Sequence, residues 1–496
     1  MKSPRSVLLI TVDCFRADHA GFLGYSRPTT PFLDSLTGES LVFSNAIVAG
    51  APTYFSFPAL LASRYPLGLG RDVVGLAPGE PTIASTLNQA GYATAAFLAA
   101  NPYLSPRFGY DTGFNVFQDF LDTKTDPLAG ESRGGNSASI PSRWNRRLAK
   151  ASHALGPVGL LYDELYFQYC QRTGTSPALS LDQLRRFPAA DVIVDHARDW
   201  LTGIAGQPFF LWLHLMDPHS PYYPRHEAFE LMGQGSFDAK RARYLNSYWN
   251  RGDLGAKRLR RHREEVVALY DAGIRWVDAQ VSRLVDILRG LGLWQNCVTA
   301  LTADHGEEFL DHGGRYHPPS NVAEELVRVP LLLRAPGAQA GIVTAPFSLM
   351  HLAPTLLDLA EVPVPGSFRG RSHTALLRTA DRWDSDAVVE CVGGCTNPFV
   401  KKNRLQARVL AIREARYKMV FDFNSASERL FDLDADPGEL RPLPIDGEKQ
   451  VRQRLLDRAR QHISDSVRSR DADNRLAARL RDLRLEWSSP TSRKSA

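Results

Sequence analysis

The chain has 496 residues, of which 44% are hydrophobic and 23% charged, and it carries a formal net charge of +5. This composition is typical of a soluble protein with a large buried core and more than one domain, and its slight positive charge suits an anionic substrate. No run of about 18 apolar residues occurs, which excludes a membrane-spanning helix. Because Lys2 to Arg5 lead directly into an apolar segment, we expect a cytoplasmic protein without a secretory signal.

Apolar strand patterns alternate with helical patterns along much of the chain. Strands are predicted at residues 6–13, 92–99, 208–215, 296–302 and 329–334. Helices are predicted at residues 30–41, 81–90, 192–201 and 264–291. This alternation favours an α/β fold, in which a mostly parallel sheet is sandwiched between helices.

Changes in the pattern divide the chain into three parts. Residues 1–385 are expected to form the α/β domain, and within it residues 120–190, rich in Gly, Ser, Pro and Arg, read as an insertion that could form a lid. Residues 386–447 are predicted to form a small antiparallel subdomain, with strands at 408–413, 417–423 and 429–432. Residues 448–496 are an Arg-rich helical tail whose end we expect to be disordered.

The five cysteines are widely spaced apart from one pair. Cys14 and Cys297 fall in or beside predicted core strands, where a free cysteine usually serves as a small apolar side chain. Cys391 and Cys395 could form a disulfide or hold a metal, but no second pair at the spacing of a zinc site accompanies them.

Two predicted strands end in residues of the types that commonly bind metal ions. The strand at 6–13 ends in Asp13, and the strand at 296–302 runs into Asp304 and His305. Open α/β sheets place ligands at the carboxyl ends of their strands. Two carboxylates and an imidazole at one sheet edge predict a site for a divalent cation and metal-assisted chemistry on an anionic substrate.

Several segments are similar, in the same order, to the motifs of one enzyme family. They are Leu8-Leu-Ile-Thr-Val-Asp13-Cys-Phe-Arg16-Ala-Asp18-His19, Leu60-Leu-Ala-Ser-Arg-Tyr65-Pro66, His214-Leu-Met-Asp217-Pro-His219-Ser-Pro-Tyr222, Thr302-Ala-Asp304-His305-Gly-Glu-Glu and Leu430-Phe-Asp-Leu-Asp-Ala-Asp-Pro-Gly-Glu439. Over residues 6–120 and 190–445 the sequence resembles the sulfatase-like branch of the alkaline phosphatase superfamily. The resemblance makes residues 1–385 the catalytic domain. It implies a mostly parallel sheet between helices, a small C-terminal antiparallel sheet, and a metal site beside a nucleophile at a helix N-terminus.

The residue at position 53 distinguishes branches of this family. True sulfatases carry Cys or Ser in a Cys/Ser-x-Pro-x-Arg motif and convert it to formylglycine, whereas this chain has Thr53 and lacks both the Pro and the Arg. The Gly-Lys-Trp-His segment of the family is also absent, and its place holds Asn101, a candidate for substrate binding. Thr at this position resembles lipoteichoic acid synthases, phosphoethanolamine transferases and nucleotide pyrophosphatase/phosphodiesterases. We therefore expect Thr53 to be a metal-activated nucleophile that forms a phosphothreonine; the alternative is a Thr that caps the following helix.

The resemblance implies one divalent metal ion. Its ligands would be Asp13, Thr53, Asp304 and His305. Many calcium sulfatases have a second Asp where this chain has Cys14, so we expect Mn²⁺ or Zn²⁺ in preference to Ca²⁺.

Further candidates surround this set. His219 is expected to contact the substrate or protonate a leaving group, and the resemblance gives His312 a catalytic role and His317 a substrate contact. The guanidinium of Arg16 could bind an anion through two hydrogen bonds. An equal alternative is that Arg16 forms a salt bridge at the surface. His214 lies inside a strand pattern and is assigned to the core.

The leading hypothesis is a metal-dependent hydrolase or transferase that cleaves a phosphate ester, or diester, through Thr53. The alternatives are an atypical sulfuric ester hydrolase without formylglycine and a non-catalytic relative that binds an anionic ligand. The expected partner is a small anionic ester, such as a phosphorylated or sulfated sugar, a lipid head group or a metabolite. Nucleic acid is not expected, because acidic residues interrupt the basic tail; leucines at helical spacing there leave a homo-oligomer open.

Overall fold

The structure is a computed structural model, and it describes residues 4–121, 164–165, 167–169, 180–204, 206–233, 235, 237–377 and 386–468. Most of the insertion predicted at 120–190 and the end of the tail beyond residue 468 lie outside the described residues. The lid and the disordered end therefore stay predictions. In the described part of the chain, no helix is both long and apolar enough to cross a membrane.

The main sheet has nine strands among the described residues, in the order β10-β2-β9-β6-β1-β5-β3-β4, with β11 also paired to β2. The strands are β1 (Ser6–Val12), β2 (Leu41–Ile47), β3 (Ala93–Leu98), β4 (Val116–Gln118), β5 (Phe209–Leu215), β6 (Cys297–Ala303), β9 (Arg328–Arg334), β10 (Gly341–Val343) and β11 (Phe347–Ser348). All neighbours pair in parallel except β9, which is antiparallel to both β2 and β6. The predicted mostly parallel sheet is confirmed.

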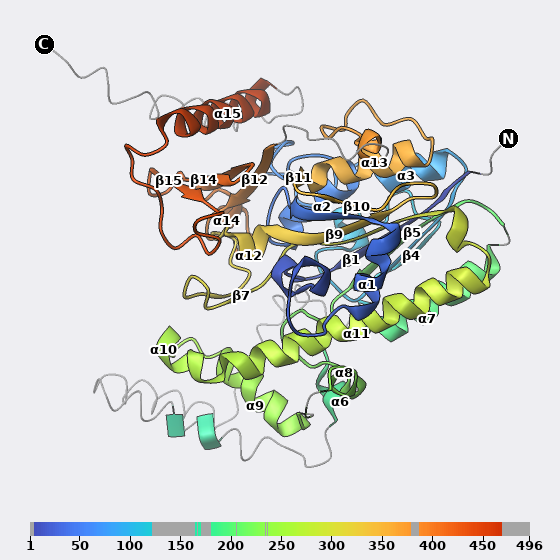
Figure 1. Cartoon of the computed structure of the whole chain (residues 1–496), viewed down its shortest axis with the longest axis horizontal. Helices are drawn as coiled ribbons and strands as arrows, with labels where there is room; N and C mark the ends of the chain where they lie inside the picture. Colours follow the sequence, from blue (N-terminus) through green and yellow to red (C-terminus); the bar gives the residue numbers. More distant parts are fainter. Residues whose placement is uncertain are drawn as a thin grey trace, which may run out of the picture.

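Helices cover both faces of this sheet (Figure 1). On one face α1 (Pro31–Leu36) and α7 (Ala190–Gly203) pack against the 28-residue α11 (Arg263–Gly290). On the other face α2 (Thr53–Ala62), α3 (Ile83–Gln89) and α13 (Leu352–Leu359) contact one another. All ten residues of α2 are buried, and a helix that is apolar all round belongs in a core. Consequently α2 is held rigidly beside the sheet.

The first predicted helix is shorter than expected. Its α-helical part ends at Leu36 and a 3₁₀ turn follows at Thr37–Glu39. The apolar run that begins at Leu41 is strand β2, which the sequence analysis missed. Short buried apolar runs fit a helix or a strand equally well, and here pairing with β9 decides for the strand.

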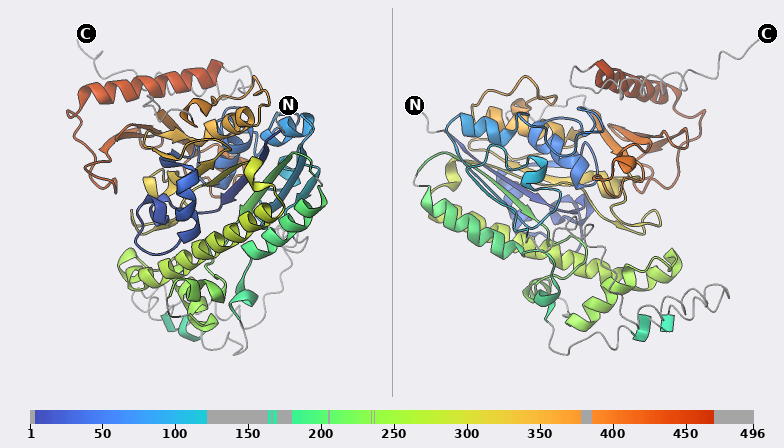
Figure 2. Two further views of the ribbon diagram at one scale, coloured as in Figure 1. Left: turned by 45° about the vertical axis from the view of Figure 1, so that its right-hand side comes forward. Right: turned by 180° about the vertical axis from the view of Figure 1, so that it is seen from behind.

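The C-terminal sheet is antiparallel, in the order β12-β13-β14-β15. Its strands are β12 (Asp386–Val392), β13 (Arg408–Glu414), β14 (Tyr417–Asp422) and β15 (Ser427–Asp432), and α15 (Lys449–Arg468) covers it (Figure 2). Leu455 of α15 packs in one buried cluster with Leu410 and Met419 of the sheet. The predicted antiparallel sheet is confirmed, with β12 as a strand that was not predicted. Cys391 and Cys395 are both free, so the disulfide alternative is wrong.

Shorter elements connect these layers. They are α6 (Leu181–Leu184), α8 (His226–Leu231), α9 (Ala239–Trp249), α10 (Ala256–Leu259), α12 (Glu324–Val327), α14 (Lys401–Arg404) and the hairpin strands β7 (Glu308–Phe309) and β8 (Arg315–Tyr316).

A buried ion cluster joins the C-terminal sheet to the main domain. The ammonium of Lys418 on β14 lies 3.0 Å from a carboxylate oxygen of Glu324 on α12 and 3.0 Å from one of Glu439, and the lysine side chain is fully buried. Replacing Lys418 with Met keeps the aliphatic stem but removes the ammonium that lies between the two buried carboxylates. We predict that Lys418→Met lowers the free energy of unfolding by about 3–5 kcal/mol.

Urea denaturation measures this loss. The control is Lys402→Met, because Lys402 is exposed and its replacement should cost less than about 0.5 kcal/mol. Equal stability of the two variants would contradict the role given to Lys418.

Candidate metal-dependent active site

The register of the central strands sets Asp13 beside Asp304. Strands β1 and β6 run parallel with Val12 level with Ala303, so the next residue of each strand leaves the sheet at the same edge. The backbone N–H of Asp13 donates to the Leu215 carbonyl of β5 at 2.8 Å, which fixes it between the two neighbouring strands. Both aspartates are fully buried. The structure thus brings the two carboxylates together as the sequence predicted.

His305 and Thr53 complete this cluster. The Nδ1 of His305 donates to the Gly306 carbonyl at 2.8 Å, so in the neutral ring Nε2 carries a lone pair. That Nε2 lies 3.2 Å from Thr53 Oγ1, 3.7 Å from Asp13 Oδ1 and 3.6 Å from Asp304 Oδ2. Thr53 is the first residue of α2, where the helix dipole favours negative charge. Four oxygen and nitrogen atoms that could bind a metal ion therefore lie close together.

The electrostatics of these groups fit a divalent cation. Burial, and then the negative charge of Asp13, raise the pKa of Asp304. Burial also acts to raise the pKa of Asp13, but His219, His214 and His305 hold it well below its ordinary value. Among the described residues, Asp304 Oδ2 is a buried carboxylate oxygen without a hydrogen-bond partner, which is costly unless a positive charge faces it. Two carboxylates, an imidazole and a hydroxyl form a donor set that such a cation uses.

Two further residues contact the Asp13 carboxylate. The side-chain amide of Asn101 donates to Asp13 Oδ2 at 2.9 Å, and the Nε2 of His214 lies 3.3 Å from the same oxygen. Asn101 was predicted to bind substrate, but its amide contacts the Asp13 carboxylate. His214 is fully buried in β5, as expected for a core residue, yet it also faces the site. The register of β1 and β5 sets His214 level with Thr11, two residues before Asp13, and no pattern within the sequence of β5 showed this.

His219, His317 and Glu307 form the remaining side of the site. The ring of His317 lies 4.6 Å from that of His305 and 5.2 Å from that of His219, measured between centroids. The side chain of His317 is 22% exposed, whereas those of Asp13, Asp304 and His305 are fully buried. This is therefore the side from which a substrate can reach the cluster.

Glu307 was not singled out from the sequence, although it stands two residues after His305. Its carboxylate is buried and accepts from His317 Nδ1 at 2.8 Å and from the hydroxyl of Tyr222. Burial acts to raise the pKa of Glu307, but the charges of His317 and His219 and the two hydrogen bonds hold it below its ordinary value.

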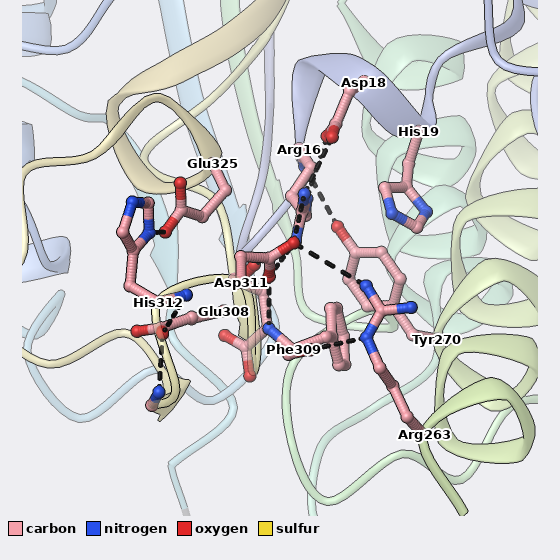
Figure 3. Close-up of polar contacts among 12 residues, drawn as sticks. Arg16, Asp18, His19, Arg263, Tyr270, Glu308, Phe309, Asp311, His312 and Glu325 are labelled. Atoms are coloured by element: carbon pink, nitrogen blue, oxygen red, sulfur yellow. Dashed lines mark hydrogen bonds and ion pairs between the residues drawn. The ribbon is translucent and has the colours of Figure 1, made fainter. Parts of the chain in front are cut away.

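Arg16 and His312 contact other partners (Figure 3). Arg16 is buried and its guanidinium lies 2.7 Å from Asp18 and 2.9 Å from Asp311, so it joins the loop after β1 to the loop after β7. His312 Nδ1 lies 2.7 Å from a carboxylate oxygen of Glu325. In the described structure neither side chain forms a hydrogen bond or ion pair with the converging donor groups, so their predicted roles at the substrate gain no support from these contacts.

Comparison with known families agrees with this architecture. The chain matches the family described as Sulfatase over residues 5–362, and the family described as N-sulphoglucosamine sulphohydrolase, C-terminal, over residues 315–465. The chain belongs to the sulfatase family. This is a family of metal-dependent hydrolases that act on sulfuric ester bonds. The resemblance drawn from the motifs is thereby confirmed at the level of the family.

Relatives of known name include sulfatases of several kinds. The chain is 25% identical over 481 residues to the arylsulfatase of Clostridium perfringens, covering 88% of this chain and 90% of that protein. It is 27% identical over 280 residues to arylsulfatase K of Bos taurus, so that the match spans half of each protein.

Solved structures share the fold at low identity. The phosphonate monoester hydrolase of Agrobacterium radiobacter superposes with a TM-score of 0.63 at 18% identity, covering 93% of this chain and 96% of that one. A structure in complex with its substrate D-glucosamine-2-N,6-O-disulfate gives a TM-score of 0.64 at 18% identity, covering 95% and 99%. At this identity the likeness shows the fold alone.

The metal cluster makes a prediction about bound metal. Asp304→Asn removes a charged donor from the point of convergence, so the affinity for Mn²⁺ or Zn²⁺ should fall by more than about 10–100-fold, the loss typical of a residue that only supports a ligand. Titration of metal-stripped protein, with metal content measured after desalting, gives this affinity. Asp457→Asn, the same change at an exposed position of α15, is the matched control and should bind metal as the wild type does; equal losses in both variants would contradict the site.

The His312–Glu325 pair makes a prediction about pH. The hydrogen bond to Glu325 outweighs partial burial and raises the pKa of His312 to about 9. A histidine whose pKa rises on folding stabilises the protein fully below its unfolded pKa of about 6.5, and this contribution is lost as the pH rises through about 9. The stability difference between wild type and His312→Gln should shrink over that window, and a difference that grows with pH would contradict the assignment.

Proposed function

We propose that this chain is a metal-dependent hydrolase that cleaves a phosphate ester, with Thr53 as the nucleophile. The observation that carries the proposal is the position of the Thr53 hydroxyl, 3.2 Å from His305 Nε2 and at the N-terminus of α2. Thr cannot be converted to formylglycine, so the hydroxyl itself must attack. Two buried carboxylates lie beside the same His305 Nε2 that the hydroxyl contacts, and this arrangement favours a catalytic centre over a binding relative.

Each residue of the site has a separate role. A divalent cation held by Asp13, Thr53, Asp304 and His305 would lower the pKa of the attacking hydroxyl and stabilise charge on the transferred group. Asn101 and His214 hold Asp13 in place for that cation. The N-terminus of α2 favours the anionic group that the nucleophile attacks. The imidazole in the donor set suits Mn²⁺ or Zn²⁺ better than Ca²⁺.

The reaction proceeds in two displacements. Thr53 Oγ1 loses its proton to solvent and forms a bond to phosphorus as the ester P–O bond breaks, while His219 or His317 in its protonated form gives a proton to the departing oxygen. Water then attacks phosphorus and gives a proton back to that histidine, the Thr53 Oγ1–phosphorus bond breaks, and the Thr53 oxygen takes up a proton from solvent. Because His219 and His317 line the more open side, the leaving group of a small anionic ester fits there. Transfer to another hydroxyl instead of water would follow the same first step.

A sulfate ester is the second candidate substrate. The similarity to an arylsulfatase along nearly the whole of both chains favours it. In that case Thr53 would have to attack sulfur directly, without the hydrated aldehyde that formylglycine provides.

Turnover of three chromogenic esters tests the proposal. With Mn²⁺ or Zn²⁺ added to metal-stripped protein, we expect cleavage of p-nitrophenyl phosphate or bis(p-nitrophenyl) phosphate, and none of p-nitrophenyl sulfate. Thr53→Ala should lower kcat by at least about 10³-fold, as loss of a nucleophile does, while Thr53→Ser keeps a hydroxyl and part of the activity. Thr202→Ala, at an exposed position of α7, is the control. Sulfate turnover that survives Thr53→Ala would overturn the proposal.

A further inference from the structure

A cavity lies at the end of α2 that is opposite Thr53. Its volume is about 990 Å³, near the upper end of the range for pockets that hold small molecules. Ala62, the last residue of α2, and Arg64 line it. Because the ten residues of α2 span about 15 Å, this cavity is separate from the cluster that contains Thr53.

We propose that the cavity binds a small organic molecule that carries a phosphate or sulfate group. The anionic group lies beside Arg371, His351 and His373, and the organic part contacts the segment that follows α2. This inference does not rest on the proposed function, because it concerns the other end of α2.

The loop that carries Arg371 is fixed to the end of α2. The Ser63 hydroxyl donates to the Met350 carbonyl at 2.7 Å and accepts from the Gly370 backbone N–H at 2.8 Å. The backbone N–H of Arg371 donates to His351 Nδ1 at 3.0 Å. This part of the lining is therefore held in place before a ligand arrives, which reduces the entropy that binding must lose.

The charges that line the cavity favour an anion. Four arginines but only three carboxylates line it. Two of these carboxylates pair with arginines of the same lining, Glu80 with Arg64 and Asp386 with Arg458. The third carboxylate, that of Asp465, is exposed on α15. The lining thus carries a net positive charge, which attracts an anionic ligand.

Arg371 and two histidines provide hydrogen-bond donors for this anion. Arg371 is exposed, and its guanidinium forms no ion pair with a carboxylate in the part of the chain that the structure describes. The rings of His351 and His373 lie 4.6 Å apart between centroids. Since the Nδ1 of His351 accepts the Arg371 N–H, the proton of the neutral ring is on Nε2 and can be donated to an oxygen of the ligand.

The pKa values of the two histidines agree with a positive potential at this place. Burial, followed by the charges of His373 and Arg371, lowers the pKa of His351 to about 3. Burial and then the charge of Arg371 lower the pKa of His373 to about 4. Both rings are neutral at pH 7, and the positive charge that disfavours their protonation favours an anion beside them.

The donor types favour a group with three terminal oxygens over a carboxylate. A guanidinium binds phosphate through two hydrogen bonds, and an imidazole N–H can donate to the third oxygen. Leu69, Pro78 and Pro81, on the segment after α2, also line the cavity. Their side chains provide the apolar contacts that the organic part of a ligand needs.

Binding of three related anions to the metal-loaded, full-length protein tests the inference. The probes are phenylphosphonate, benzenesulfonate and benzoate, which share an aromatic ring and contain no ester bond, and calorimetric titration measures their affinities. We expect phenylphosphonate or benzenesulfonate to bind, and the tighter of the two tells phosphate from sulfate. Benzoate should bind at least about 10-fold more weakly, because it accepts fewer charge-assisted hydrogen bonds.

Replacement of Arg371 locates this binding in the cavity. Arg371→Gln removes the guanidinium and should lower the affinity about 10-fold. Arg260→Gln, the same change at an exposed position before α11, is the matched control and should bind as the wild type does. Equal affinities of the two variants would overturn the inference, as would benzoate binding as tight as that of the other probes.

Two further variants separate the cavity from the active site. Ser367→Trp places a large ring at an exposed position of the lining and should abolish this binding, whereas Ser35→Trp, at an exposed position of α1, should not. Asp304→Asn weakens the metal site and should leave binding in the cavity unchanged. Binding that is lost in Asp304→Asn but unchanged in Ser367→Trp, or no binding at millimolar concentrations, would overturn the inference. Binding in the cavity without any ester turnover would contradict the proposed function alone.

Discussion

Two carboxylates that the fold buries side by side, those of Asp13 and Asp304, impose the constraint on which the site depends. Neither is exposed to water, and two like charges in a buried place cannot both be ionised without a compensating positive charge. The register of β1 and β6 creates this pair, and the core on both faces of the sheet holds it. The other two potential metal ligands, His305 and Thr53, lie beside this pair of carboxylates.

The position of α2 places a hydroxyl group near the two buried carboxylates. A buried helix begins at Thr53, so its hydroxyl meets the carboxylates at the positive end of the helix dipole. The same edge of the sheet receives His305 from β6 and His214 from β5. Two buried carboxylates, a hydroxyl and the partly exposed ring of His317 together fit a site for attack on an anionic ester.

The sequence predicted those parts of the site that stand at the ends of strands. Asp13, Asp304 and His305 follow apolar runs that can be recognised by their periodicity, and the resemblance placed Thr53. Contacts that depend on register or on loop geometry could not be predicted. His214 looked like core because nothing in a single strand shows that its ring lies level with Thr11 on the neighbouring one. The contacts of Glu307 and Asn101, and the partners of His312, depend on loops. The sequences of these loops carry no periodic hydrophobic pattern.

The same distinction applies to the fold. Long amphipathic elements such as α11 were predicted to within a residue or two, whereas β2 was missed because a short apolar run has no unique period. Its identity comes from pairing with β9, almost 300 residues later in the chain. The ion cluster of Lys418 likewise joins two sheets that sequence patterns treat as separate.

The stereochemical outcome at phosphorus tests the central claim most directly. A phosphate diester made chiral at phosphorus with two oxygen isotopes is hydrolysed by the wild type in water that carries the third isotope, and the configuration of the monoester product is determined. Attack by Thr53 followed by attack by water comprises two in-line displacements, each of which inverts the centre. The account predicts net retention of configuration. Net inversion would show that water attacks the substrate directly, and would contradict the role of Thr53.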